Sequence, residues 1–326
     1  MMKSKEYRNT QILANLVCGI LALLALLPFI LLIVASLTDN TWATANGFSF
    51  FPGSWSLDAY RYIAVQWATI GRAYLMTIVV TIIGTAASIM VTTLFAYAIC
   101  QQEVPGMKLL SFVMVFTMLF NGGLVATYYS YVNYFHVRNT IWALVVPNLL
   151  MNAFNVILVR NYFTNSIPAS LIEAARLDGA SEFGIFFRIV MPLSLPIIAT
   201  IGLMTALGYW NDWQNGMYYL TERGGGQYYT IQIVLNNINE NINALRQSAS
   251  ATGNMNIQMP STTVRMAIAT VGILPILLIY PIFPEILCQR YYAGRGERVT
   301  RSKEVSPASI IQMFRYKNHL TDILNG

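Results

Sequence analysis

Long apolar stretches, each of the roughly 20 residues that a helix needs to cross a bilayer, constrain the fold of this chain more than any other feature. Lipid offers the backbone no hydrogen-bond partners, so spanning segments must be helical or form closed barrels. The sequence therefore predicts an all-α integral membrane protein with six transmembrane helices. The predicted spans are Gln11–Leu37, Tyr74–Cys100, Met107–Ala126, Ile141–Phe163, Ile189–Tyr209 and Thr263–Phe283.

The composition supports this prediction, because 56% of the 326 residues are hydrophobic and only 10% are charged. A soluble globular domain carries about 25% charged residues. The net charge of +6 does not indicate nucleic-acid binding, since seven of the twenty Lys and Arg lie after Phe283 and no basic helix with interleaved aromatics occurs elsewhere. The three cysteines and two histidines have no metal-type spacing, so we predict no metal site.

The positive-inside rule predicts the orientation of the chain. Lys3, Lys5 and Arg8 place the N-terminal segment 1–10 in the cytoplasm. An even number of crossings then returns the C-terminus to the cytoplasm, and the loop 164–188 lies there too. The long loops 38–73 and 210–262 are rich in Trp, Gly, Ser and Asn, which suits the outer face.

Helix breakers occur inside several predicted spans. Asn121-Gly122-Gly123 is predicted to interrupt the third span, and the prolines to interrupt others. Irregular backbone at membrane depth is tolerated where protein or a water-filled cavity satisfies it. In the fourth span, the spacing of Asn148, Asn152 and Asn155 predicts one polar helix face, which serves either interhelical hydrogen bonding or a solute path. The prolines are Pro28, Pro147, Pro196, Pro275 and Pro281.

The cytoplasmic loop 164–188 has the pattern of a helix–turn–helix. Pro168 stands near a helix start, and Ser170 with Glu173 predicts a capping box. Gly179 is suited to the left-handed position that ends a helix, and Ser181 is suited to cap a second one. The small Ala174 and Ala175 would let another protein approach the backbone closely.

This loop carries the signature E-A-A-x3-G-x9-I-x-L-P, matched at Glu173, Ala174, Ala175, Gly179, Ile189 and Pro192, with Met191 in place of Leu. The chain thereby resembles permease subunits of ABC importers. It is most similar to the carbohydrate branch, with its maltose-type and oligosaccharide-type permeases. The resemblance covers about residues 10–283 and includes Phe120-Asn-Gly-Gly-Leu-Val-Ala-Thr-Tyr, Asn139-Thr-Ile-Trp-Ala-Leu and Gly208-Tyr-Trp-Asn-Asp-Trp.

The resemblance implies the type I ABC importer permease fold and a role in moving a carbohydrate, expected to be an oligosaccharide, into the cytoplasm by alternating access. It implies a bacterial inner-membrane location and a multi-pass topology. The partners expected are a second permease (in a heterodimer), two cytoplasmic ABC ATPases, an extracellular solute-binding protein and membrane lipid. The residues expected to couple to the ATPase are Glu173, Ala174, Ala175, Asp178, Gly179, Ile189 and Pro192.

The chain is not predicted to be an enzyme. It lacks the G-x4-G-K-[ST] phosphate loop, because Gly224-Gly225-Gly226 has no lysine and lies in a predicted outer loop. ATP and Mg are therefore expected on the partner ATPase, with no cofactor on this chain. It also lacks H-E-x-x-H and G-x-S-x-G, which argues against an intramembrane enzyme.

Two alternatives stay open at this point, an ABC permease for a non-sugar solute and a channel that needs no ATPase.

A cluster of polar and aromatic residues follows the fifth span. It would either contact the solute or form an interfacial aromatic belt with a capping Asp. The candidates for the solute path are Asn121, Asn148, Asn152, Asn155, Trp210, Asn211, Asp212 and Trp213.

The tail 284–326 departs from the rest of the chain in composition. Pro284–Thr300 can be encoded so that reading from the second base gives Gln-Lys-Tyr-Phe-Val-Lys-Gly-Ile-Thr-Leu-Gly-Ala-Val-Lys-Gly and a stop, a pattern like the usual end of related permeases. Our hypothesis is that an extra base near codons 283–284 put this tail out of frame. The nucleotide sequence of the gene tests it directly.

Overall fold

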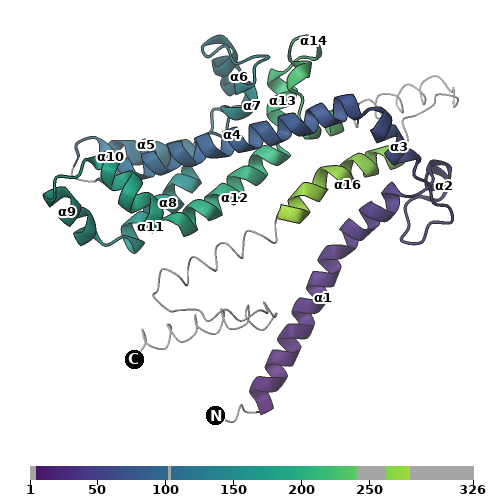
Figure 1. Ribbon diagram of the computed structural model, residues 1–326, viewed down its shortest axis with the longest axis horizontal. Coiled ribbons are helices and arrows are strands. Elements are labelled where there is room, and N and C mark those ends of the chain that lie inside the picture. Colours follow the sequence, from purple (N-terminus) through teal and green to yellow (C-terminus); the bar gives the residue numbers. More distant parts are fainter. Residues whose placement is uncertain (1–4, 102–103, 239, 241–261, 280–326) are drawn as a thin grey trace. The chain divides into compact units, whose positions relative to one another are not determined.

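Helices account for nearly all regular structure in the residues that this computed structural model describes, which are 5–101, 104–238, 240 and 262–279. Within those residues the only strand-like pairing is one antiparallel bridge between Thr38 and Trp55. The prediction of an all-α protein is confirmed (Figure 1). The elements are α1 Lys5–Ser36, α2 Asn40–Asn46, α3 Asp58–Val65, α4 Trp67–Cys100, α5 Met107–Leu119, α6 Gly123–Asn133, α7 Trp142–Val145, α8 Ala153–Ser166, α9 Ala169–Leu177, α10 Glu182–Ile185, η1 Phe186–Val190, α11 Met191–Leu193, α12 Leu195–Asn211, α13 Gln214–Tyr219, α14 Glu222–Gly225, η2 Gly226–Tyr228 and α16 Thr262–Ile279.

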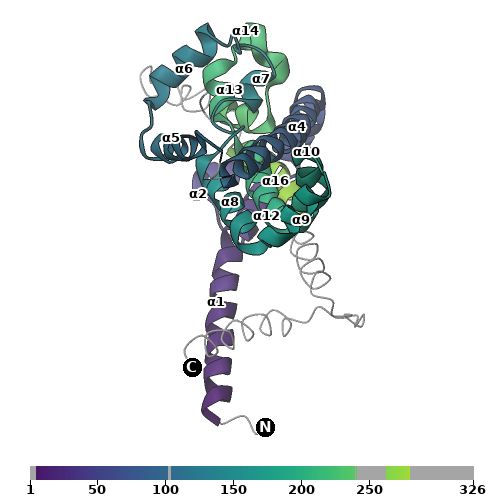
Figure 2. The same cartoon turned by 90° about the vertical axis from the view of Figure 1, so that its left-hand side faces the viewer.

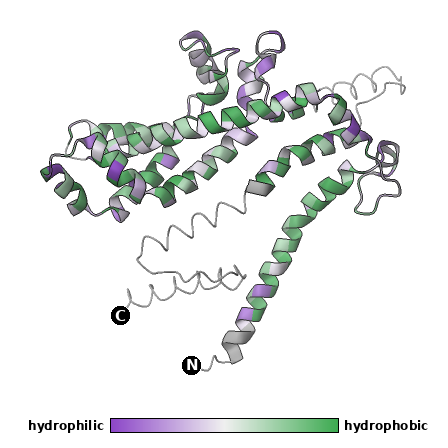
Figure 3. Ribbon diagram, in the orientation of Figure 1, coloured by the Kyte–Doolittle hydropathy of each residue, from purple (hydrophilic) through white to green (hydrophobic). Residues whose placement is uncertain are grey.

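Two described helices are by themselves long and apolar enough to cross a membrane, and they match the first two predicted spans. They are Thr10–Ser36 within α1 and the 34-residue α4. Apolar residues predominate along both helices (Figure 3), which suits a membrane-crossing segment. α4 begins at Trp67, seven residues before the predicted Tyr74, so Arg72 lies inside the helix. The sixth predicted span is α16 as far as Ile279, and the rest of it lies outside the described residues.

The third, fourth and fifth predicted spans are each interrupted or bent. The third is divided into α5 and α6 by a first break at residues 120–122, where Gly123 has a φ of +80°. The fourth is divided into α7 and α8 by a second break at 146–152, where Asn148 has a φ of +62°. The fifth, predicted from Ile189, bends by 81° between the helical segment that ends at Leu193 and the helix that begins at Leu195, and it could be a third crossing only if both sides of the bend count as one span. Pro192 and Pro196 flank this bend and lack the N–H groups that would continue the helix.

Not every predicted breaker acts as one. Pro28 lies inside α1 and Pro275 inside α16, and both helices continue through them. A single proline removes one hydrogen bond, which a long helix can absorb when its neighbouring turns are regular. Pro281 lies outside the described residues. The second break also corrects the predicted polar face of the fourth span, because Asn148 lies in irregular backbone rather than on a helix that it would share with Asn155.

The centre of the packing is α4, which lies side by side with α8 and α12 (Figures 1 and 2), while α1 pairs with α16. Gly84 lets α12 come close, because a Cβ at that position would stand 2.5 Å from the ring of Tyr209. The hydroxyl of Tyr209 then reaches across to donate a hydrogen bond to the Val145 carbonyl at 2.8 Å. The amide of Asn215 donates to the Pro147 carbonyl at 3.0 Å. These bonds satisfy backbone groups where the fourth span is broken.

Candidate functional site

The cytoplasmic loop 164–188 forms an elbow of two short helices, α9 and α10. α9 begins after Pro168, whose extended backbone occupies the N-cap without any side-chain capping bond. The predicted capping box of Ser170 and Glu173 is therefore wrong. The physical reason for the difference is Pro168, because the helix begins directly after it. Ser170 then lies inside the first turn, where its hydroxyl cannot cap the helix.

The turn of the elbow agrees with the sequence prediction. Gly179 has a φ of +82°, and the N–H of Ala180 closes the helix on the Ala175 carbonyl at 3.0 Å. A Cβ at Gly179 would meet nothing within 4 Å, so backbone conformation rather than space requires the glycine. Ser181 caps α10 by accepting a hydrogen bond from the N–H of Gly184 at 3.2 Å.

The two faces of the elbow differ in what they contact. Ile172 and Ala175 pack against the buried cluster that contains Phe163 and Ile167. The opposite face is open, with Leu177 89% and Phe183 71% exposed. Glu173, Ala174 and Asp178 are exposed as well. Exposed patches of large apolar side chains are typical of protein-binding surfaces.

Four polar side chains join the elbow to the end of α4, and we call them the polar network: Tyr97, Gln101, Arg176 and Glu182. No sequence pattern predicted this network. The guanidinium of Arg176 bonds Glu182 Oε1 through Nε and Gln101 Oε1 through Nη2, each at 2.8 Å. The hydroxyl of Tyr97 donates to Glu182 Oε2 at 2.6 Å. The opposite charges of Arg176 and Glu182 on either side of the Gly179 turn could have indicated the ion pair. The sequence could not indicate that Tyr97 and Gln101, more than 70 positions away, lie beside it.

The hydrogen bonds of this network stabilise the charged form of its carboxylate. The Tyr97 hydroxyl and then the Arg176 guanidinium lower the pKa of Glu182 below its ordinary value, against a smaller effect of burial. A cavity of about 230 Å³ lies beside the network, between α9 and the ends of α4 and α8. Cys100, Thr164 and Glu173 are among its lining residues.

The last two residues of the predicted signature lie where the fifth span starts. Ile189 is in the π-helical turn η1, and Pro192 is at the beginning of α11. They precede the 81° bend, so the elbow and the bend are connected by only a short helical segment.

The predicted solute-path residues fall into two groups. Asn121 lies in the first break, and its Oδ1 accepts a hydrogen bond from the N–H of Gly123. Asn152 lies at the second break and caps α8, because its Oδ1 accepts hydrogen bonds from the first N–H groups of that helix, including that of Asn155. Asn148, in the second break, is exposed.

The group at the end of α12 is largely engaged with the protein itself. Trp210 is 8% exposed and donates from Nε1 to the Gly272 carbonyl of α16 at 3.2 Å. Asn211 bonds back to the Leu207 carbonyl, and Asp212 accepts from the N–H of Asn215. Trp213 is 38% exposed.

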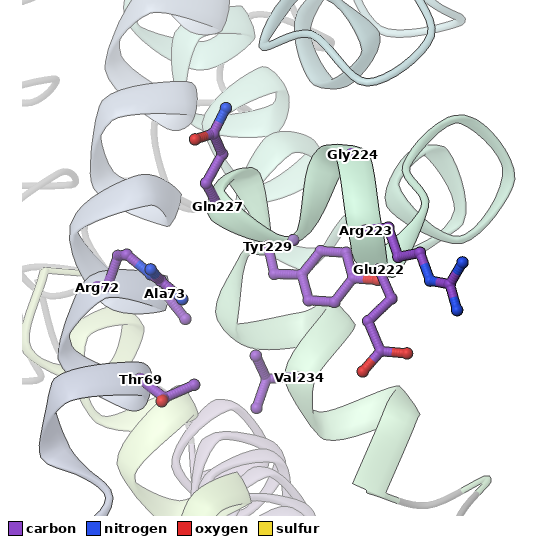
Figure 4. Close-up of a pocket in the computed structure, with 10 residues that line it drawn as sticks. Thr69, Arg72, Ala73, Glu222, Arg223, Gly224, Gln227, Tyr229 and Val234 are labelled. Atoms are coloured by element: carbon purple, nitrogen blue, oxygen red, sulfur yellow. The ribbon is translucent and has the colours of Figure 1, made fainter.

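A hollow of about 460 Å³ lies on the predicted outer side, between the first turns of α4 and residues 222–234. Thr69 and Arg72 of α4 lie across it from Tyr229 and Glu222 (Figure 4). Its lining carries both signs of charge and two glycines, which suits a solvated loop pocket. Among the described residues no group of three or more His, Cys, Asp or Glu could hold a metal ion.

Comparison with known proteins gives consistent results. Residues 94–291 match the family described as "Binding-protein-dependent transport system inner membrane component". The "Polygalacturonan/rhamnogalacturonan transport system permease protein YtcP" of Bacillus subtilis (strain 168) is 39% identical over 260 residues, covering 80% of this chain and 88% of the relative. "Protein LplC" of the same organism is 34% identical, covering 81% and 88%.

A solved structure is similar along nearly its whole length. It is a bacterial ABC transporter "involved in the import of the acidic polysaccharide alginate". One of its chains superimposes with a TM-score of 0.71 and 29% identity, covering 87% of this chain and 99% of that one.

Proposed function

This chain belongs to the family of binding-protein-dependent transport system inner membrane components, and from that premise we propose how it performs transport. As a member it is a permease subunit of an ABC importer, a transport component rather than an enzyme, with the type I permease fold. An ATPase and a solute-binding protein are the partners that this family implies. The alternative of a channel without an ATPase is not favoured.

The solute that we propose is an oligosaccharide. Relatives in this family carry names for the transport of polygalacturonan/rhamnogalacturonan, of arabinooligosaccharides and of melibiose, raffinose and stachyose. The similar solved transporter is described for alginate. What these solutes share is a chain of sugar units, so the proposal is made at the level of that class.

We propose that the elbow is the docking element for the ATPase. The observation that carries this is the exposed apolar face of Leu177 and Phe183, next to Glu173 and Asp178, on a loop held in shape by Gly179. Ala174 lets the partner approach the backbone, and Ile189 and Pro192 pass movement into the bent fifth span. ATP and Mg would be bound by the ATPase, with no cofactor on this chain.

For the solute path we propose the two breaks. Irregular backbone in a span is tolerated where it lines a water-filled cavity or is buried in protein. Asn121, Asn148 and Asn152 bring amide groups to these breaks, and amides suit sugar hydroxyls as donors and acceptors. Asn155 in α8 and Trp213 would extend the path. The bonds of Trp210, Asn211 and Asp212 give those residues a supporting role beside it.

The finer assembly is also a proposal. Two different permeases would form a heterodimer in the bacterial inner membrane, surrounded by lipid, with two ATPases beneath it. The chain would be multi-pass with both termini in the cytoplasm; Lys3, Lys5 and Arg8 before the first span support this for the N-terminus, and six crossings would return the C-terminus to the same side.

The test is uptake by the complete complex in proteoliposomes, with radiolabelled oligogalacturonides and arabinooligosaccharides and a radiolabelled amino acid for comparison. We expect sugar uptake that needs both ATP and the solute-binding protein. Uptake of the amino acid alone would point to the non-sugar permease. Sugar uptake without ATP would point to a channel.

The elbow is tested by a series at Gly179 together with Glu173→Lys. Since only backbone conformation requires this glycine, Asn should retain most of the solute-dependent ATP turnover, Ala less, and Pro none. Membrane insertion should be normal in each variant. Full transport by Gly179→Pro or by Glu173→Lys would contradict the docking role.

A further inference from the structure

The polar network of Tyr97, Gln101, Arg176 and Glu182 links three separate segments of the chain. Arg176 belongs to α9, Glu182 to the first turn of α10, and Tyr97 and Gln101 to the end of α4. Both carboxylate oxygens of Glu182 and two nitrogens of Arg176 are used in it. All these bonds involve a charged group, and charge-assisted bonds are the shorter and stronger kind.

On one side α9 is held by apolar packing, because Ile172 and Ala175 contact the buried cluster that contains Ile99 and Phe163. α9 packs on α10, but its backbone makes no comparable contact with α4 within the described part of the chain. The cavity of about 230 Å³ lies in this space, bordered by Tyr97, Gln101 and Arg176. Two helices on either side of a cavity can shift relative to each other unless something fixes their separation. The polar network is what spans this gap.

The network also grips the end of α4 at two points. Tyr97 lies in the last turn of α4, and Gln101 is the C-cap residue that directly follows the helix. Arg176 holds Gln101 directly, and it holds Tyr97 through Glu182. A displacement of α9 is therefore applied to the last turn of α4 and to its C-cap, and α4 packs along α8 and α12.

Stability does not account for this arrangement. The side chains of Arg176 and Glu182 are 39% and 54% exposed. An exposed ion pair contributes only about 0–1 kcal/mol to the free energy of unfolding. The network therefore adds little stability, whereas its convergent short bonds fix the position of α9 against α4.

We propose that Tyr97, Gln101, Arg176 and Glu182 are positioning residues that transmit movement of α9 to α4, so that ATP-driven displacement of the elbow moves the solute-carrying spans. This inference rests on the proposed function, because it requires that an ATPase docks on the elbow. It assigns the network no contact with solute or nucleotide.

The experiment uses the complete complex of both permeases, ATPase and solute-binding protein in proteoliposomes. Sugar uptake and ATP hydrolysis are measured together, and their ratio is the readout, because a loss of folded protein lowers both and leaves the ratio unchanged. For Arg176→Gln and Tyr97→Phe we expect the uptake per ATP to fall by roughly fivefold or more, the lower end of ordinary coupling free energies. The ATPase should still copurify with each variant.

A charge exchange separates the ion pair from other roles of its members. Arg176→Glu alone and Glu182→Arg alone should uncouple, and the double variant should recover part of the ratio because it restores opposite charges across the turn. The matched control is Arg61→Gln, which removes the exposed ion pair with Asp58 on α3 and should leave the ratio unchanged.

The outcomes distinguish a failure of the proposed function from a failure of this inference. If the wild-type complex shows no solute-dependent ATP turnover, the proposed function and this inference both fail. If the wild type is coupled and Arg176→Gln and Tyr97→Phe keep its ratio, only this inference is overturned. Loss of the ATPase from the Arg176→Gln complex would show that Arg176 docks the ATPase, which contradicts the positioning role proposed for it. Tyr97→Phe tests the contact with α4 independently, because Tyr97 lies away from the docking face.

Discussion

The elbow and the second break are held in place by opposite means. At the second break the carbonyls of Val145 and Pro147 are bonded by Tyr209 and Asn215, which are 1% and 4% exposed. At the elbow the bonds are made by half-exposed charged groups beside a cavity. A buried neutral bond in close packing holds its two segments inside the membrane region, whereas the half-exposed charged bonds hold α9 to the end of α4 at the water-exposed end. The comparison indicates a rigid membrane interior and a cytoplasmic end in which α9 and the end of α4 move together.

The largest effect that tests this contrast is expected for Gly84→Leu. A Cβ at Gly84 would already stand 2.5 Å from the Tyr209 ring, so the larger side chain must separate α12 from α4 and break the bond to Val145. We expect a loss of about 3 kcal/mol or more in the free energy of unfolding, the upper range for overpacking. Thermal denaturation of the purified permease in detergent measures it.

The matched control for that variant is Gly19→Leu in α1, where a Cβ would meet nothing within 4 Å. Its stability should stay within about 0.5 kcal/mol of the wild type, as at other open positions. If both variants were equally stable, the close approach of α4 and α12 would not be the rigid part of the molecule.

The sequence predicts well the features that depend on local chemistry. Gly179 and Ser181 act as their residue types suggest, since a left-handed position and an N-cap depend on one residue and its neighbours. The glycines after Asn121 likewise mark the first break. Pro28 and Pro275 show the limit, because a proline lowers helix stability without deciding whether the rest of a span compensates for it.

Features that join distant segments could not be predicted. The polar network brings Tyr97 to Glu182, and Trp210 finds its partner at Gly272 of α16. A single sequence shows charge and type but no distance between such residues. For the same reason the sequence alone predicts a solute contact for Trp210 as readily as an interfacial position, while in the structure its indole N–H is bonded inside the protein.

A smaller effect is expected for Leu177→Ser on the open face of the elbow. Leu177 is 89% exposed, so its replacement should leave the stability of the isolated permease unchanged. Docking should weaken, because burying a leucine contributes about 1.5–3 kcal/mol. We expect roughly a tenfold rise in the Kd for the ATPase, which corresponds to about 1.4 kcal/mol. Titration of the ATPase onto the permease in nanodiscs measures this.

Val65→Ser on α3 is the control, since Val65 is 85% exposed on a predicted outer segment. It should change neither stability nor ATPase binding. An unchanged Kd for Leu177→Ser would show that the exposed apolar face is not the docking surface. A large loss of stability would show instead that Leu177 packs within the permease.

The smallest effect is the pH dependence of the polar network. The pKa of Glu182 is lowered in the folded protein by the Tyr97 hydroxyl and the Arg176 guanidinium, so the network stabilises the fold above the ordinary glutamate pKa. That contribution is lost as the pH falls through the lowered pKa, because the protonated carboxyl binds the guanidinium weakly. Since the pair is half exposed, we expect less than about 1 kcal/mol. The difference in Tm between wild type and Glu182→Gln should therefore be present at neutral pH and vanish on acidification; a difference that grew toward acid pH would mean that Glu182 is not held as a carboxylate.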